Sequence, residues 1–344
     1  MNRKHFIGST LSIIAAKTAF GKSTQSTITD WIEDIKPTIL PPFLQLGDTI
    51  GITSPAGYIA LEDIQSAVKK IESWGYQVLV GKTIGKKDFT FGGTDEERRA
   101  DFQEMLDNDA IKAILCARGG YGLVRIIDQL NFRRFQQHPK WIIGFSDATI
   151  LHAHVNSNFR IASIHAKMCN SFPADWSTAE INQVLSLESI SNALKGSINP
   201  IQLSSNPSNI WGQATGELIG GNLKIIETLC GTSSNLKTDG KILFLEDTDE
   251  YLYSIDRMFW NLKRSGKLNK IKGLIIGGFK TKPDDPGEEF GLSLEQLVLE
   301  KIKNANIPVC FGFPVGHQKH NMALICGANY RLTVNADEAV LEII

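Results

Sequence analysis

Hydrophobic and polar positions between residues 48 and 160 follow a pattern that predicts strands alternating with helices. Apolar runs that end in short turns, and so predict buried strands, occur in "DTIGITSPAG", "IKAILCARGGYG" and "KWIIGFSD". Apolar residues at helical spacing lie between them in "LEDIQSAVKKIESWG" and "TDEERRADFQEMLDND", and Thr94 is expected to cap the second helix. This alternation indicates a parallel, doubly wound sheet over residues 42–170.

The pattern changes beyond residue 170. Residues 171–210 are rich in Ser, Asn and Pro, so we interpret them as a linker segment that contains one helix, "EINQVLSLESISNAL". Residues 211–344 combine glycine-rich stretches, helices and short alternating strands. The predicted fold is α/β, with an N-terminal, mostly parallel doubly wound sheet domain and a C-terminal mixed α/β domain that has a barrel-like sheet.

Residues 1–25 have the layout of a leader. Arg3 and Lys4 precede a short apolar region, and small residues follow near Ala19, which is typical of a secretory signal. The start is also similar to a twin-arginine signal with Lys4 in place of the second arginine. We therefore expect a periplasmic or otherwise exported protein. The alternative is a cytoplasmic protein with an amphipathic N-terminus.

Composition narrows the class of protein. The chain has 344 residues, 42% hydrophobic and 21% charged, with a net charge of -1. A balance of this kind gives no support for nucleic-acid binding, and no apolar run of about 18 residues after the leader predicts a membrane span. None of the five cysteines forms a CxxC pair, so neither a disulfide framework nor a metal site is indicated.

Three turns follow predicted strands of the first region, and one of them holds a candidate nucleophile. The turns "TSPAG", "ARGGYG" and "GFSD" should meet at one edge of the sheet, because parallel strands end there together. Ser146 in "GFSDA" lies in a sequence similar to the nucleophile elbow GxSxG, without its last glycine. Gly119 and Gly120 allow backbone N–H groups to approach a ligand. The alternatives are an ordinary tight turn and a helix capped by Ser146 or Asp147.

A serine nucleophile needs a base and an acid that orients the base. His317 follows a glycine at a predicted strand end in "PVGHQKHN". Glu246 closes the apolar strand "ILFLE", where a carboxylate is held rigidly and partly desolvated. The alternatives are a structural histidine and a solvated acidic turn.

Six motifs in order add to this interpretation: "GITSPAG", "IKAILCARGGYG", "GFSDAT", "GELIGGNLKIIETLCGT", "LFLEDTDEYLYSIDRM" and "FPVGHQKHNMALICGA". From about Pro42 to the C-terminus, the chain resembles the LD-carboxypeptidase family of serine peptidases, which includes the microcin-immunity peptidases. The resemblance implies a catalytic triad of Ser146, Glu246 and His317. It also implies an oxyanion hole formed by the N–H of Asp147 and that of Gly119 or Gly120.

The resemblance further implies a serine carboxypeptidase of peptidoglycan recycling that acts through an acyl-enzyme. Its substrate would be a murein tetrapeptide, cleaved between the L-centre of diaminopimelate and the terminal D-Ala. No cofactor would be needed, and a homodimer is expected. Arg118 and Asn222 are candidate substrate-binding residues, and Trp176 is either a third or a hydrophobic latch. Two alternatives stay open: a peptidyl or aminoacyl nucleotide as the substrate, and a non-catalytic module that holds an anionic ligand.

The chain departs from the family at one motif near the site. Many relatives have His-Gly-Pro after the nucleophile helix, whereas this chain has Ala166 and Lys167 after His165. We therefore expect the contacts with the substrate near Ala166 and Lys167 to differ from those in the relatives. Many relatives are also cytoplasmic enzymes without a leader.

Overall fold

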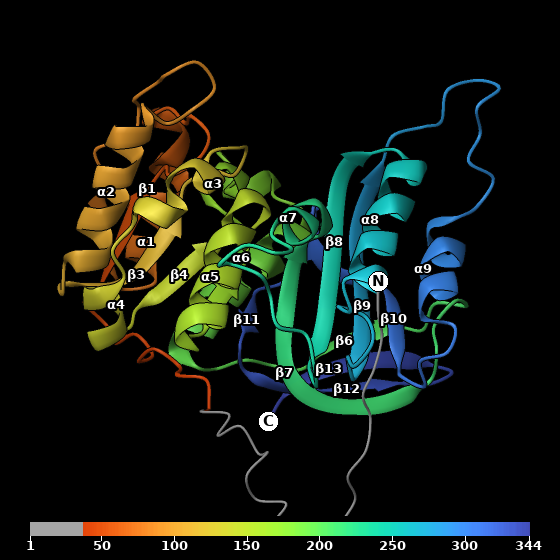
Figure 1. Ribbon diagram of the computed structural model, residues 1–344. Helices are drawn as coiled ribbons and strands as arrows, with labels where there is room; N and C mark the ends of the chain where they lie inside the picture. Colours follow the sequence, from red (N-terminus) through yellow and green to blue (C-terminus); the bar gives the residue numbers. More distant parts are fainter. Residues whose placement is uncertain (1–36) are drawn as a thin grey trace, which may run out of the picture. The chain divides into compact units, whose positions relative to one another are not determined.

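The apolar runs of the first half form a six-stranded sheet with the order β11–β5–β4–β3–β1–β2 (Figure 1). The strands are β1 (Thr49–Thr53), β2 (Gln77–Val80), β3 (Ile111–Cys116), β4 (Trp141–Gly144), β5 (Ser163–His165) and β11 (Leu324–Cys326). All neighbours are parallel except β11, which runs antiparallel to β5. The structure is a computed structural model that describes residues 37–344; the leader predicted over residues 1–25 lies outside the described residues.

Helices follow the strands of this sheet as the periodicity predicted. They are η2 (Glu62–Ile64), α1 (Gln65–Ser73), α2 (Asp95–Asp107), α3 (Leu123–Ile126), η3 (Ile127–Gln129), α4 (Arg133–Gln137), η4 (Ser146–Ala148), α5 (Thr149–Phe159), η5 (Cys169–Ser171), η6 (Trp176–Thr178) and α6 (Ile181–Lys195). The predicted cap of α2 is confirmed: Thr94 Oγ1 accepts from Glu97 N at 3.2 Å, and Glu97 Oε2 accepts from Thr94 N at 3.0 Å. Such a capping box satisfies two backbone donors that a helix start leaves open.

A second sheet of seven strands has the order β10–β9–β8–β7–β12–β13–β6. The strands are β6 (Ile201–Ser204), β7 (Gly212–Asn222), β8 (Ile242–Glu250), β9 (Gly273–Thr281), β10 (Val309–Gly316), β12 (Asn329–Val334) and β13 (Glu338–Ile343). The helices of this half are α7 (Leu223–Thr228), α8 (Leu252–Arg264) and α9 (Leu294–Ile302). Ile210, in the connection from the edge strand β6 to β7, exchanges two hydrogen bonds of 3.0 Å with Val309 on the other edge strand, β10. The sheet is therefore nearly closed, and the predicted α/β fold with a parallel sheet and a barrel-like sheet is confirmed.

Helix α5 connects the two sheets. It packs on β4 and β5 of the first sheet and on β7 and α7 of the second half (Figure 1). At its first residue, Thr149 Oγ1 accepts a hydrogen bond of 3.0 Å from the backbone N of Asn222. The end of β4 is thereby held against the end of β7, which brings the turn after β4 close to residues of the second half.

Helix α6, inside the segment interpreted as a linker, holds the chain between β10 and β11. Ser186 Oγ accepts from Asn321 N and Ser189 Oγ accepts from Ala323 N, each at 2.8 Å. The apolar face of α6, which includes Leu187, belongs to the buried core. The segment therefore positions the loop that follows His317.

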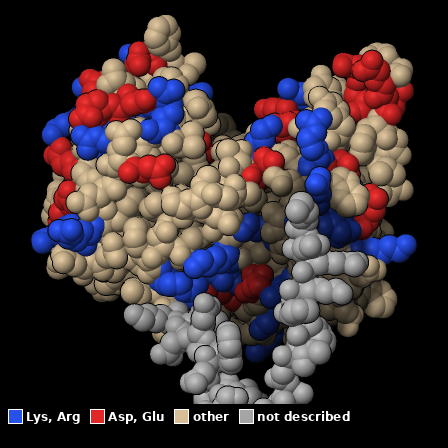
Figure 2. Space-filling model, in the orientation of Figure 1, with Lys and Arg blue, Asp and Glu red and all other residues tan. Residues whose placement is uncertain are grey.

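The surface agrees with the near-zero net charge. Figure 2 shows acidic and basic side chains side by side over most of one face, with an acidic group at the upper right, on the loop that precedes α9. Within residues 37–344, every helix is too short or too polar to cross a lipid bilayer.

Candidate active site

The turn after β4 holds Ser146 in an unusual backbone conformation. Its φ of +62° lies in the left-handed region, which residues other than glycine seldom adopt. The turn is tight, because a Cβ on Gly144 would lie 2.8 Å from the Cβ of Ala148. The position before α5 makes no side-chain cap. Asp147 Oδ2 instead accepts from Leu123 N at 2.9 Å, at the start of α3. The helix-cap alternative for this turn is therefore wrong.

The glycine turn after β3 lies directly against Ser146. A Cβ on Gly119 would be 3.0 Å from the Cβ of Ser146 and 3.2 Å from its Oγ. Gly119 O also accepts a hydrogen bond of 2.9 Å from the N of Gly57, in the turn after β1. Gly120 has a φ of +104° and approaches Gly57 rather than Ser146. The turns after β1, β3 and β4 thus meet at one edge of the sheet, as expected.

Glu246 and His317 form a hydrogen-bonded pair in the second half. Glu246 is fully buried on β8, and its Oε2 accepts from His317 Nδ1 at 2.6 Å and from His317 N at 3.2 Å. Gly316 has a φ of +96°, and a Cβ there would lie 2.4 Å from the Cβ of Glu246. This position needs glycine for both reasons.

The expectation that Glu246 closes its strand is wrong. Strand β8 continues to Glu250 because a register shift after Leu245 renews its pairing with β9. Glu246 is completely buried and Asp247 almost so. The alternative of a solvated acidic turn is therefore wrong for these two carboxylates.

The pair has the electrostatics of a base and its orienting acid. Burial favours the neutral carboxyl of Glu246, but the neighbouring His165 and His317 outweigh it and lower its pKa to about 2. Burial also acts to lower the pKa of His317, but the hydrogen bond and negative charge of Glu246 outweigh it, and the pKa is raised. Since Nδ1 is bound to Glu246, Nε2 is the ring nitrogen left to exchange a proton with a substrate or nucleophile.

Phe145 lies between the two halves of the site. Its ring centroid is 4.9 Å from that of His317, and Ser146 is the next residue in the chain. Ser146 Oγ makes no hydrogen bond to another described residue. The ring next to Ser146 in the chain therefore contacts His317, which brings the loop of the histidine to the turn of the serine. Catalytic hydrogen bonds of an enzyme without substrate are often long.

His165 lies on the other side of Glu246, and the sequence reasoning did not assign it a role. Its Nε2 is 4.0 Å from Glu246 Oε1, too long for a direct hydrogen bond. Both ring nitrogens of His165 and this carboxylate oxygen are buried without a partner among the described residues. Strands β4 and β5 are neighbours in the sheet, and Gly144, just before the Ser146 turn, pairs with His165.

The three predicted substrate-binding residues differ in their surroundings. Arg118 and Trp176 line a cavity of about 560 Å³ beside the glycine turn. The exposed Arg118 donates to Tyr58 O at 2.9 Å. Asn222 has an internal role, because its Oδ1 accepts from Ile225 N at the start of α7 and its Nδ2 donates to Asp247.

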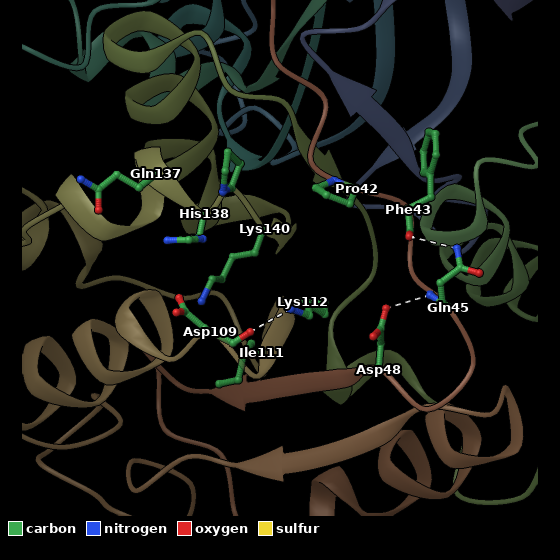
Figure 3. A pocket seen from close by; sticks show the side chains of 11 residues that line it. Pro42, Phe43, Gln45, Asp48, Asp109, Ile111, Lys112, Gln137, His138 and Lys140 are labelled. Carbon is green, nitrogen blue, oxygen red and sulfur yellow. Dashed lines mark hydrogen bonds between the residues drawn. The ribbon is translucent and has the colours of Figure 1, made fainter.

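A different cavity, of about 410 Å³, lies at the amino ends of the parallel strands (Figure 3). Asp48, Ile111 and Lys140 line it, at the starts of β1, β3 and β4. Lys140 Nζ donates to Met105 O and Asn108 O at 3.1 and 2.6 Å, at the carboxyl end of α2. Ligands of such sheets bind at the carboxyl ends of the strands, so this cavity is separate from the candidate site.

Comparisons with known proteins identify the family of the chain. A family model described as the LD-carboxypeptidase N-terminal domain matches residues 50–166, and one described as the C-terminal domain matches residues 215–332. The chain is 33% identical over 312 residues to the "probable murein peptide carboxypeptidase" of Bacillus subtilis (strain 168), covering 88% of this chain and 94% of that protein. It is 26% identical over 343 residues to the microcin C7 self-immunity protein of Escherichia coli, covering 89% and 96%.

A solved structure has the same fold. The crystal structure of muramoyltetrapeptide carboxypeptidase from Oxalobacter formigenes superposes with a TM-score of 0.76 at 28% identity. The match covers 86% of this chain and 98% of that one. It spans both sheets, because nearly the whole described part of the chain is included.

Proposed function

Because this chain belongs to the LD-carboxypeptidase family of serine peptidases, we propose that it removes the terminal D-Ala from murein tetrapeptides by cleaving its amide bond to the L-centre of diaminopimelate. Family membership makes the chain a hydrolytic enzyme, so the alternative of a non-catalytic module loses its support. The observation that carries the proposal is the Glu246–His317 hydrogen bond of 2.6 Å, whose histidine contacts Phe145, the residue before the strained Ser146.

The proposed mechanism is acyl transfer. His317 Nε2 removes the proton of Ser146 Oγ while Glu246 holds the ring and stabilises the imidazolium. Ser146 attacks the scissile carbonyl, and its oxyanion is bound by the N–H of Asp147 and that of Gly119 or Gly120. His317 then protonates the leaving amine of D-Ala, and a water molecule activated by the same histidine hydrolyses the ester.

The positions of the glycine turns support this assignment of the oxyanion donors. Asp147 follows the nucleophile at the start of η4, where backbone N–H groups are not yet paired within a helix. Gly119 lies against Ser146, which favours its N–H over that of Gly120 as the second donor. The carboxylate of Asp147 accepts a hydrogen bond from Leu123 N at the start of α3, so we assign it a structural part.

Two observations favour a murein peptide over a nucleotide conjugate. The "probable murein peptide carboxypeptidase" of Bacillus subtilis is 33% identical to the chain, whereas the microcin C7 self-immunity protein is 26% identical. Trp176 is also occupied within the protein: its Nε1 donates to Ser66 Oγ at 3.1 Å, and Lys70 Nζ lies 4.5 Å from the ring centroid. A ring held in this way acts as a latch and offers less of its face for stacking with a base.

Incubation with purified muropeptides tests the proposal, with mass spectrometry as the readout. The chain should remove one D-Ala from a tetrapeptide and leave a tripeptide. S146A should abolish this release, and S73A, which alters an exposed serine on α1, should preserve it. Release of D-Ala by S146A at the wild-type rate would overturn the assignment. Cleavage of an aspartyl-adenylate conjugate alone would favour the nucleotide alternative. Export and the homodimer stay predictions.

A further inference from the structure

Lys167 is a buried cation without a negatively charged partner. It is 9% exposed, and its Nζ donates one hydrogen bond, of 2.7 Å, to the backbone O of Gln318. No carboxylate within residues 37–344 lies within 4.0 Å of this Nζ. Burial lowers the pKa of Lys167, and no carboxylate counteracts it. A buried ammonium in this state is unfavourable unless an anion joins it.

The other buried lysines differ from Lys167. Lys301 forms an ion pair with Asp256. Lys140 and Lys267 donate only to backbone carbonyls, as Lys167 does, but the charges of Asp109 and Asp239 act on them from farther away. Each of these three therefore has an acidic residue of the protein near it. Lys167 is the exception among the buried lysines of the described chain, and it is the one that lies at the candidate active site.

The position of Lys167 follows from the sheet. Gly144 of β4 pairs with His165 of β5, so Ser146 and Lys167 lie at matching distances beyond the ends of neighbouring parallel strands. Lys167 Nζ is 5.9 Å from the ring centroid of Phe145, the residue before Ser146. Its acceptor, Gln318 O, belongs to the residue that follows His317. The ammonium therefore lies between the nucleophile turn and the loop of the base.

We propose that Lys167 binds the terminal carboxylate of the substrate, the group that leaves with D-Ala; this inference rests on the proposed function. The leaving nitrogen must be within hydrogen-bonding reach of His317 in order to receive its proton. The carboxylate carbon of D-Ala lies about 2.5 Å from that nitrogen, since two covalent bonds separate them. Lys167, beside the loop that carries His317, is thus on the side of the scissile bond where D-Ala leaves. There the terminal carboxylate of the substrate supplies the negative charge that Lys167 lacks.

Arg118 belongs to the other side of the scissile bond. It precedes Gly119 and lines the cavity with Trp176, beside the turn that we assign to the oxyanion. This cavity is suited to the acyl part of the substrate, so the two cations have different tasks. Lys167 then explains why the enzyme acts on a chain end: an internal amide has no carboxylate at this position.

Two substrates that differ at one group test the proposal: the murein tetrapeptide with a free terminal carboxylate and the same peptide with a terminal carboxamide. The wild type should prefer the acid in kcat/KM by roughly 100-fold, the scale expected when a buried charge pair is lost. K167M should lose most of this preference through its rate with the acid. K319M removes an exposed positive charge from the same loop and should keep the preference.

The outcomes separate the inference from the function on which it rests. A wild type that releases no D-Ala overturns both. A wild type that cleaves acid and carboxamide equally, or a K167M variant that retains the preference, overturns the role of Lys167 and leaves the carboxypeptidase assignment standing. Loss of reactivity of Ser146 in K167M toward an uncharged fluorophosphonate would also overturn the role, because it would mean that Lys167 holds the site together rather than binding the carboxylate.

Discussion

The two halves of the site hold their functional groups by different physical means. Ser146 is positioned by the path of the backbone: a left-handed φ, a tight approach of β4 to η4, and no hydrogen-bonding partner for its Oγ among the described residues. Glu246 and His317 are positioned by hydrogen bonds to each other: Glu246 is fully buried on β8 of the second sheet, and His317, directly after β10, is partly buried. The first region should therefore depend mainly on the shape of the backbone, and the second on charge as well as on shape.

The two regions also have one feature in common. In each of them a glycine, which has no side chain, leaves room for a functional residue. Gly119 borders Ser146, and Gly316 borders Glu246. The contact at Gly316 is the closer one, since a Cβ there would lie 2.4 Å from Glu246 rather than 3.0 Å from Ser146. The variants that follow separate charge from shape, in order of decreasing effect.

Removal of the charge of Glu246 should have the largest effect. E246Q preserves size but removes the negative charge that stabilises the His317 imidazolium, so kcat/KM for D-Ala release should fall about 10⁴-fold. E250Q changes the same residue type further along β8, where Glu250 pairs with Lys224, and should change kcat/KM little. An E246Q variant with nearly wild-type kcat/KM would contradict the role of this carboxylate.

The pH dependence of E246Q tests whether the charge of Glu246 raises the pKa of His317. In the wild type the pKa of His317 is raised, so activity should be lost as the pH falls through a value above the ordinary 6.5 of histidine. Without the charge of Glu246, burial lowers that pKa, and the acidic limb of kcat/KM should move to lower pH. Asp247 and Asp249 also act on His317, and His165 faces Glu246, so these residues are left intact. An acidic limb of kcat/KM that lies at the same pH in E246Q and in the wild type would contradict the effect of Glu246 on His317.

Substitution of Gly316 by alanine should have the next largest effect on activity. Alanine at a φ of +96° is strained, and its Cβ would collide with Glu246, so G316A should lower the free energy of unfolding by about 3 kcal/mol and activity by about 10²-fold. G312A is the matched control on β10, because Gly312 has a φ of +73° with nothing within 4 Å of an added Cβ. Equal loss of activity in both variants would show that strain rather than contact with Glu246 matters.

Substitution of Asp147 by asparagine should have the smallest effect on activity. Burial raises the pKa of its carboxyl to about 6, and the side chain accepts one hydrogen bond, from Leu123 N. D147N keeps an acceptor for this bond and keeps the backbone N–H assigned to the oxyanion, so kcat should fall less than about tenfold. A loss as large as that expected for E246Q would mean that the carboxylate takes part in the chemistry. Labelling of Ser146 with a fluorophosphonate gives an independent readout.

Much of the first sheet could be predicted because its signals are local. Apolar runs, helical spacing and the cap at Thr94 each act within a few residues, and the structure has the expected strands and helices there. The meeting of the three turns followed from the rule that parallel strands end at one edge. The prediction that Glu246 ends its strand was wrong, because the register shift that extends β8 depends on its partner β9 and leaves no mark in the sequence of β8.

The sequence by itself determined the fold class and which residue types were available for catalysis, since periodicity and motif order are properties of the chain. Only the tertiary structure decided that Glu246 contacts His317, that β11 from the C-terminal tail joins the first sheet beside β5, and that Lys167 is buried beside the nucleophile turn. These facts depend on contacts between segments far apart in the chain. Burial and distance, which set the pKa values and the pairing of charges, come into existence only when those segments pack together.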